Sequence, residues 1–315
     1  MNAIKDLHKS VGSAIQAIVM PTVKIFTAPL VKNKDTILSI PKQTESYGPH
    51  PRHKLDIYYS TTDPKNAPIL LFFYGGGLVS GDKITPLVPG GLVYHNVGAF
   101  FAQRGINVII PDYRRVNSER GGEDAQYPSG GEDVSLSLKW LESFEGGDKS
   151  KVFLMGNSAG GLHVSTWLLE PKFLEQRKAL QGGGKAVLKG VVDLGVPFGF
   201  REAHPDRMDM LQKYYGGLEQ AQELCPHGLL QAVAKTGKSR KEIGVPKELV
   251  LVSEFEPVDE VRAPSENFVK LSNEIWGDGL EFREIPGHNH ISPVMSLLSG
   301  EGEQWGDDVA KWIKD

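Results

Sequence analysis

The sequence predicts an α/β fold in which a mostly parallel central sheet is flanked by helices. Short, almost wholly apolar runs recur along the chain, and the run at 67–74 (Ala-Pro-Ile-Leu-Leu-Phe-Phe-Tyr) is typical of a strand buried on both faces. These runs alternate with longer segments whose apolar residues recur at helical spacing, which favours parallel strands joined by helical connections. The chain has no internal repeat or clean linker, so we expect one domain over 1–315.

The alternation gives an order of elements. Strands are expected at 54–59, 67–74, 106–111, 152–155, 189–196, 247–252 and 280–285, and helices at 96–104, 131–144, from 158 onward, at 265–276 and at 303–313. Two segments depart from the pattern. Residues 115–129 are polar and glycine-rich and predict a loop, whereas residues 197–246 are irregular and mostly helical and interrupt the alternation.

The first forty residues carry apolar side chains at roughly helical spacing. Charged and polar residues break this stretch, so it does not read as a secretory signal. Pro21, Lys24 and Pro29 interrupt the apolar content before it could span a bilayer. We expect an amphipathic helix lying over the domain, with peripheral membrane contact as the alternative.

Composition excludes several classes of partner. The chain of 315 residues has 40% hydrophobic and 23% charged residues and a formal net charge of −4, without a long run of one sign. Nucleic acid is therefore not expected as a partner, and neither is an anionic membrane. A single cysteine, Cys225, rules out an intrachain disulfide, and no N-x-S/T sequon is present. Both features favour a reducing, cytoplasmic location.

The most informative motif is Gly156-Asn-Ser-Ala-Gly160, which follows the apolar run at 152–155 and precedes a helical segment. This is the G-x-S-x-G pattern in its strand–turn–helix setting. The sharp turn needs small neighbours, which Gly156 and Gly160 supply, and it would raise Ser158 Oγ above the sheet at a helix N-terminus. The alternative is an ordinary glycine- and serine-rich loop, because a pentapeptide alone is a weak signal.

A nucleophilic serine needs a base and an acid, which should follow late strands. His288 and His290 both follow the last predicted strand; the Gly287-x-x-His spacing favours His290, and no further Cys or His stands nearby to complete a zinc site. The acid candidates after 247–252 are Glu254, Glu256, Asp259 and Glu260. Glu256 is preferred because it sits before Pro257 where the strand should end, and Asp259 remains an alternative.

Donors for an oxyanion are expected from the glycines after the strand at 67–74. Glycines let the backbone approach a substrate and aim N–H groups at it. We predict the backbone N–H groups of Gly76, Gly77 and Ala159 as the donors. A phosphate-binding loop is disfavoured, since Gly81-Asp82-Lys83 does not match its Gly-Lys-Ser/Thr ending.

Together these placements resemble the α/β-hydrolase superfamily, and within it the hormone-sensitive-lipase-like carboxylesterases, over Lys54 to the C-terminus. The motifs that carry the resemblance are Tyr74-Gly-Gly-Gly77, Asp112-Tyr113-Arg114 with Tyr127-Pro128 and Glu132-Asp133, Gly156-Asn-Ser-Ala-Gly-Gly161, and Ser253-Glu-Phe-Glu-Pro257. The chain departs from the family at four points: Tyr74 stands for histidine, Asn157 for aspartate, Glu256 for the commoner aspartate, and an Ala-Pro-Glu segment after Arg114 is missing. These departures bear on the substrate class.

The resemblance implies an α/β-hydrolase fold with a helical cap over the acyl pocket, formed here by about 1–45 and 198–245. Tyr74, Phe198 and Tyr214 are then expected to contact substrate, with ordinary packing inside the cap as the alternative for the residues of the insertion. Phe200, Met208, Met210 and Tyr215 are further candidates of that kind.

The predicted function is a serine carboxylic-ester hydrolase for small to medium esters, with Ser158 as nucleophile, His290 as base and Glu256 as acid, and without a cofactor or metal. Two alternatives stay open. One is an amidase or arylformamidase-like hydrolase on the same triad, and the other is a non-catalytic ligand receptor on the same fold. Oligomeric state is left open, with a homodimer as one option.

Overall fold

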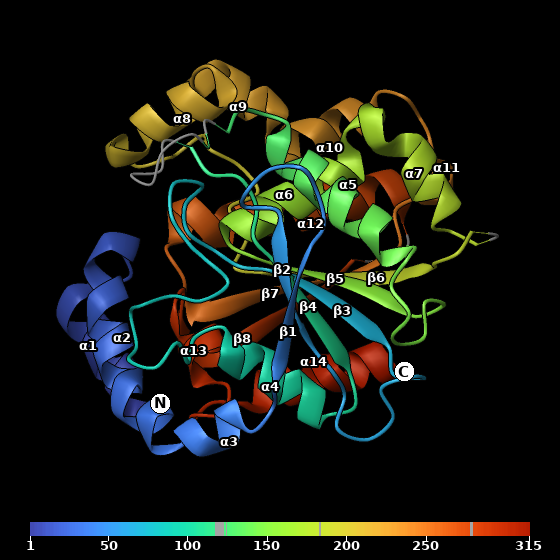
Figure 1. The fold of residues 1–315 in the computed structure, drawn as a ribbon. Helices are drawn as coiled ribbons and strands as arrows, with labels where there is room; N and C mark the ends of the chain where they lie inside the picture. Colours follow the sequence, from blue (N-terminus) through green and yellow to red (C-terminus); the bar gives the residue numbers. More distant parts are fainter. Residues whose placement is uncertain (117–122, 124, 183, 278–279) are drawn as a thin grey trace.

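The computed structural model describes residues 1–315 except 117–122, 124, 183 and 278–279. Within the described residues, eight strands form one sheet in the order β1-β2-β4-β3-β5-β6-β7-β8 (Figure 1). The strands are β1 (Lys42–Ser46), β2 (Lys54–Tyr58), β3 (Ile69–Phe73), β4 (Asn107–Pro111), β5 (Val152–Asn157), β6 (Leu188–Leu194), β7 (Lys247–Phe255) and β8 (Glu281–Asn289). Strands β4-β3-β5-β6-β7-β8 pair in parallel, whereas β2 is antiparallel to β1 and β4, so the predicted mostly parallel sheet is confirmed.

Helices cover both faces of the sheet, and Figure 1 shows α5, α6, α10 and α12 on one face and α4 and α14 on the other. The helices are α1 (Asn2–Val11), α2 (Ile15–Lys32), α3 (Lys34–Leu38), α4 (His95–Gln103), α5 (Ser129–Leu141), α6 (Ala159–Leu169), α7 (Leu174–Ala179), α8 (Met208–Tyr215), α9 (Leu218–Leu224), α10 (Pro226–Ala234), α11 (Arg240–Ile243), α12 (Ala263–Trp276), α13 (Ser292–Ser296) and α14 (Gln304–Lys314). Short 3-10 turns occupy Pro171–Phe173 and Pro205–Arg207, and a π-helical turn occupies Val258–Arg262.

The elements expected from the apolar pattern all occur, within a few residues of their predicted ends. The central strands β3, β4 and β5 are buried along their whole length, as their continuous apolar sequence requires. The irregular segment 197–246 contains α8 to α11, and part of the loop predicted at 115–129 lies outside the described residues. Strand β1 was not predicted because it lies at the sheet edge, partly exposed, with a polar sequence.

Pro21, Lys24 and Pro29 were expected to interrupt the apolar content of this segment before it could span a bilayer, but they lie inside one continuous helix, α2. Helix α2 runs through Pro21 and Pro29 for 18 residues. Each proline removes one backbone hydrogen bond, but α2 buries a row of side chains against the protein, and packing of this kind stabilises most helices. The buried residues are Ile18, Thr22, Val23, Phe26 and Leu30. Among the described helices, α2 alone is long and apolar enough to cross a membrane by length and composition.

Candidate active site

Ser158 lies at the sharp turn between β5 and α6, with φ 51° and ψ −121°. Such a positive φ is uncommon for a residue other than glycine and marks a strained turn. The two flanking glycines make the turn feasible. A Cβ at Gly156 would lie 2.4 Å from Gly161 Cα, and one at Gly160 would lie 2.1 Å from the Phe73 carbonyl oxygen. The predicted strained serine turn with obligatory small neighbours is therefore present.

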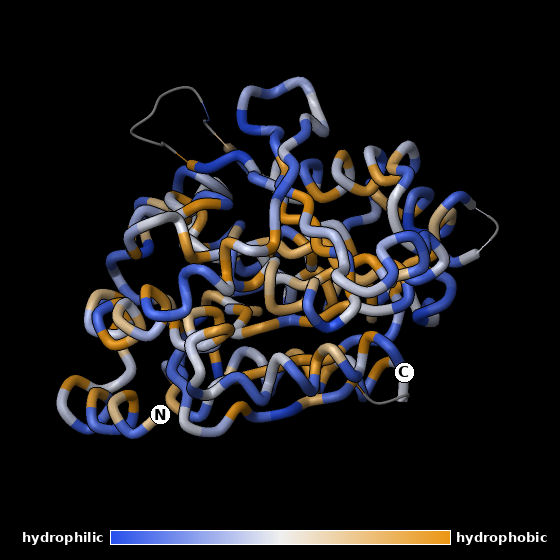
Figure 2. Tube along the Cα trace, turned by 60° about the horizontal axis from the view of Figure 1, so that its bottom comes forward, coloured by the Kyte–Doolittle hydropathy of each residue, from blue (hydrophilic) through white to orange (hydrophobic). Residues whose placement is uncertain are grey.

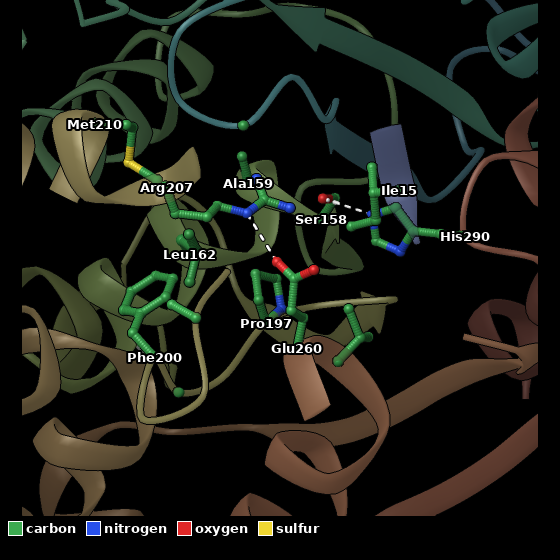
Figure 3. A pocket seen from close by; sticks show the side chains of 14 residues that line it. Ile15, Ser158, Ala159, Leu162, Pro197, Phe200, Arg207, Met210, Glu260 and His290 are labelled. Atoms are coloured by element: carbon green, nitrogen blue, oxygen red, sulfur yellow. Dashed lines mark hydrogen bonds and ion pairs between the residues drawn. The ribbon is translucent and has the colours of Figure 1, made fainter. Parts of the chain in front are cut away.

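A chain of hydrogen bonds connects Ser158 with His290 and Glu256. His290 follows β8, and its Nε2 lies 3.0 Å from Ser158 Oγ. Its Nδ1 lies 2.7 Å from Glu256 Oε2, at the end of β7. His290 and Glu256 are 6% and 3% exposed, so little water competes for these bonds. The three side chains predicted from the sequence are thus brought together at the carboxyl edge of the sheet, and Figure 3 shows the contact between Ser158 and His290.

The rival histidine and acids lie elsewhere. His288 hydrogen-bonds through Nδ1 to Ser292 Oγ and through Nε2 to the Gly302 carbonyl, and burial lowers its pKa to about 4. Asp259 is exposed, and Glu254 accepts a hydrogen bond from the Gly287 N–H. The hydrogen bonds of Ser158 and His290 described above involve neither His288 nor Asp259. In the part of the chain that the structure describes, no group of three or more His, Cys, Asp or Glu side chains is placed to hold a metal ion.

The glycines after β3 form a tight turn beside Ser158. Gly76 and Gly77 have φ of 147° and 62°, values that side chains disfavour. The Gly76 carbonyl accepts hydrogen bonds from Ser80 N and Ser80 Oγ at 2.9 and 2.8 Å, which closes the turn. Gly77 and Ala159 both line the cavity next to Ser158. Ala159 is the first residue of α6, where backbone N–H groups favour negative charge.

Tyr74 does not line the cavity, contrary to the expectation that it contacts substrate. Its side chain is fully buried behind the glycine turn, where its hydroxyl donates to Asp112 Oδ1 at 2.6 Å and accepts from Arg52 Nη2 at 2.7 Å. Arg52 Nη2 and Arg115 Nη1 also donate to the Gly81 carbonyl, at 3.2 and 2.7 Å. Burial raises the pKa of Tyr74 well above its usual value, and the nearby Asp112 adds to the effect. This cluster holds the far end of the turn.

The segment Asp112-Tyr113-Arg114 connects that cluster with α5. The Tyr113 hydroxyl donates to the Tyr74 carbonyl at 2.8 Å. Arg114 donates through its backbone N and its Nε to the two carboxylate oxygens of Asp133, at 2.8 and 2.9 Å. Burial alone would favour the protonated acid, but hydrogen bonds from His53 and Arg114 outweigh it and lower the pKa of Asp133. These residues shape the site from behind.

A narrow cavity of about 30 Å³ lies next to Ser158 (Figure 3). Its lining residues are Ile15, Gly77, Ser158, Ala159, Leu162, Pro197, Gly199, Phe200, Ala203, Arg207, Met210, Glu260, Val261 and His290. Both segments expected to form a cap contribute to this wall, through Ile15 and through residues 199–210. Arg207 reaches in from the insertion, and its Nε donates to Glu260 Oε2 at 2.9 Å.

Phe198 and Tyr214 were expected to contact substrate, but they pack behind the cavity wall. Phe198 is fully buried and stacks on Phe268 with ring centroids 4.1 Å apart. The Tyr214 hydroxyl accepts a hydrogen bond from the Gly130 N–H at 3.2 Å. Their neighbours Phe200 and Met210, also candidates from the sequence, do line the cavity.

Ile15, Arg207 and Glu260 line the cavity but were not predicted individually to do so. Ile15 lies far from the motifs along the chain, and Arg207 lies in the irregular insertion. Glu260 was considered only as a rival to Glu256 and instead pairs with Arg207. An isolated Arg and Glu 53 positions apart give no pattern that predicts such a pair.

Comparison with known proteins agrees with this geometry. The family model BD-FAE matches residues 55–202, which include the glycine turn and Ser158 but not Glu256 or His290. A probable isoprenylcysteine alpha-carbonyl methylesterase of Arabidopsis thaliana is 33% identical over 131 residues, which cover 42% of this chain and 28% of that protein. The chain therefore matches under a third of the length of this curated relative.

Solved structures match over nearly the whole chain. Esterase B of Lactobacillus rhamnosis has a TM-score of 0.66 at 18% identity and covers 100% of this chain and 96% of its own. An esterase of the bacterial hormone-sensitive lipase family has a TM-score of 0.59 at 16% identity, and the match covers 93% of this chain and 97% of the esterase. At these identities the likeness is one of fold. The chain has the α/β-hydrolase fold.

Proposed function

We propose that this chain is a serine carboxylesterase in which Ser158 is the nucleophile, His290 the general base and Glu256 the orienting acid. The observation that carries the proposal is the hydrogen-bonded chain from Ser158 Oγ through His290 to Glu256 at a strained turn. The similar proteins, a probable methylesterase and two esterases, support the same bond type.

The chemistry follows from the positions of these groups. His290 Nε2 accepts the proton of Ser158 Oγ as the oxygen attacks the ester carbonyl, and Glu256 stabilises the resulting imidazolium through Nδ1–H. The tetrahedral oxyanion is stabilised by the N–H groups of Gly76, Gly77 and Ala159. The imidazolium then protonates the leaving alcohol. Water, deprotonated by the same imidazole, releases the acid from the acyl-enzyme and restores the serine.

The cavity lining supports a small to medium ester. It is mostly apolar, with Leu162, Phe200 and Met210 on one side of Ser158 and the Arg207–Glu260 pair beside them. An apolar pocket of this kind binds acyl chains by removing their surface from water. The ion pair, with both side chains partly buried, limits how long an unbranched chain can be before it must contact charge.

The test is the intact mass of the protein after exposure to a serine-directed organophosphonate, together with hydrolysis of p-nitrophenyl acetate to octanoate. One adduct is expected, lost in Ser158→Ala and retained in the control Ser143→Ala, whose serine is exposed and does not line the cavity. Removing Ser158 or His290 should lower kcat by about 10⁴-fold or more, as in other triads. The chain length at which kcat/KM falls then measures the pocket.

Three outcomes would contradict the proposal. Faster turnover of an N-formyl anilide than of the matched formate ester would favour an amidase on the same residues. Absence of both adduct and turnover, with a tightly bound small molecule, would favour a receptor. A Ser158→Ala variant with undiminished hydrolysis would instead move the nucleophile to another residue.

A further inference from the structure

The outer face of α2 lacks the polar character that a water-exposed helix face normally has. The exposed residues of α2 are Gln16, Ala17, Met20, Lys24, Ala28, Val31 and Lys32. Five of them follow helical spacing along one stripe: Ala17, Met20, Lys24, Ala28 and Val31. Met20 and Val31 are 59% and 43% exposed. A helix on the surface of a globular protein usually presents charged and polar residues to water. Four of these five are apolar, and the fifth is a lysine.

The opposite face of α2 fixes the helix on the protein. It is buried, and Thr22 Oγ1 accepts a hydrogen bond from Asn289 Nδ2 at 2.8 Å. At the end of α2, Asn33 Nδ2 donates to the Leu298 carbonyl at 3.1 Å. The helix therefore lies flat against the body of the molecule, and Figures 1 and 2 show α1 and α2 together at one side of it. Its outer stripe faces away from the protein.

The first forty residues are positively charged, whereas the rest of the chain is negatively charged. Residues 1–40 contain five lysines and two aspartates, a formal charge of +3, whereas the whole chain carries −4, which leaves −7 for the remainder. From Leu7 to Lys34 there is no acidic residue at all. Lys24 and Lys32 on α2, Lys9 on α1 and Lys34 on α3 are all exposed.

These observations distinguish between two partners that could cover the exposed stripe of α2, a second copy of this chain and an anionic lipid surface. A second copy paired through the same face would bring two α2 stripes together, and α2 carries lysines but no acidic residue, so like charges oppose such a symmetric contact. A negatively charged lipid surface satisfies both features, because the apolar side chains enter the headgroup boundary and the lysines contact the headgroups. We propose that the outer face of α2 docks this protein on an anionic lipid surface.

Docking on this face would place the lipid beside the cavity. Ile15, in the first turn of α2, lines the cavity next to Ser158, and Asn289, which is bonded to Thr22, precedes His290. The apolar stripe and the cavity wall thus belong to one helix. Membrane contact, not expected from the composition of the whole chain, becomes the preferred partner once the outer face of α2 is considered by itself.

The test is flotation of the full chain with vesicles of phosphatidylcholine alone or mixed with an equal amount of phosphatidylglycerol. Binding is expected to the anionic vesicles only, and to weaken as salt approaches about 1 M, where the Debye length falls to about 3 Å. Lys24→Gln should lower the partition coefficient about fivefold, the effect of one cation near an anionic surface. The matched control Lys270→Gln, with a side chain 76% exposed on α12, should leave it unchanged.

Met20→Glu should lower binding at least about tenfold, since it removes an apolar contact and adds a repelled charge. Its control is Gln231→Glu, which adds the same charge at an exposed position of α10. Wild-type protein that fails to float with anionic vesicles overturns the proposal, as does equal binding by Met20→Glu. A dimer that Met20→Glu dissociates, without flotation, assigns the stripe to a second copy instead. Because flotation needs no turnover, Ser158→Ala should bind as wild type does.

Discussion

Replacing Tyr74 with phenylalanine removes one hydroxyl from a buried ionic cluster and leaves the ring in place. That hydroxyl bridges Asp112 Oδ1 and Arg52 Nη2, at 2.6 and 2.7 Å. Hydrogen bonds with charged groups contribute about 1.5–3 kcal/mol each, but Lys83 remains as a donor to Asp112 through both its backbone N and its Nζ. We therefore expect Tyr74→Phe to lower the free energy of unfolding by about 2–4 kcal/mol.

The same substitution should slow ester hydrolysis more than it weakens substrate binding. Arg52 is held between Tyr74 and the Gly81 carbonyl, at the end of the turn that carries Gly76 and Gly77. Loss of a whole oxyanion donor costs about 10²–10³ in kcat, and a loosened donor should cost less, about tenfold. Because the donors of the glycine turn bind the oxyanion of the transition state more strongly than the carbonyl of the bound substrate, KM should change little.

The assay combines urea unfolding, followed by tryptophan emission, with saturation kinetics on p-nitrophenyl acetate. Tyr59→Phe is the matched control, since Tyr59 is 36% exposed and its loss of a hydroxyl should change stability by no more than about 0.5 kcal/mol. A Tyr74→Phe protein with the stability and kcat of the Tyr59→Phe control would refute the view that this cluster holds the turn.

Three further predictions concern the acid, a buried aspartate and the serine turn. Glu256→Gln should lower kcat by about 10³–10⁴ on a p-nitrophenyl ester, because the amide cannot stabilise the imidazolium; an unchanged kcat would assign the orienting role elsewhere. Asp193 is fully buried, and within the described residues both its carboxylate oxygens lack a hydrogen-bond partner; burial, with Glu248 nearby, raises its pKa well above the usual value. The native state thus keeps a proton on Asp193 that the unfolded chain releases above pH about 4, so the wild-type protein loses stability as pH rises. The free energy of unfolding of Asp193→Asn in urea, relative to that of wild type, should therefore grow by about 1.4 kcal/mol per pH unit. A difference between the two proteins that does not change with pH would contradict this. Gly160→Ala should lower the unfolding free energy by more than about 3 kcal/mol, since its Cβ would lie 2.1 Å from the Phe73 carbonyl oxygen, and a thermal unfolding midpoint close to that of wild type would count against the close approach.

The sheet could be predicted because its signal is local. Strands buried on both faces need continuous apolar runs, and β3, β4 and β5 have them. The serine turn could also be predicted, because the contacts that require its glycines are local. A side chain at Gly156 would collide with Gly161, and one at Gly160 would collide with Phe73 on the adjacent strand. The order nucleophile, acid, base along the chain then led to Glu256 and His290, which the structure brings to hydrogen-bonding distance.

The side chains behind the site could not be predicted, because their partners are distant in the sequence. Tyr74 stands where the resemblance has a histidine, and only Arg52, 22 positions earlier, shows why a buried hydroxyl suits this place. Phe198 and Phe200 are two positions apart in the same irregular segment, yet one stacks on α12 and the other lines the cavity. No periodicity distinguishes them.

Helix α2 shows how packing outweighs a local preference. Its prolines oppose helix formation one residue at a time, but five side chains buried on one face outweigh them. The exposed apolar residues on the other face were hard to recognise in the sequence, because they are interleaved along the chain with the buried ones.

The insertion that carries Arg207 leaves the sheet after β6 and returns at β7, and these two strands are neighbours. Its two ends are therefore anchored side by side, so its length and sequence can change without moving the strands that hold Ser158 and Glu256. The family model stops at residue 202, just inside this excursion. Exchanging the insertion of about fifty residues as a unit would therefore change the cavity wall, while the sheet keeps Ser158 and Glu256 in place.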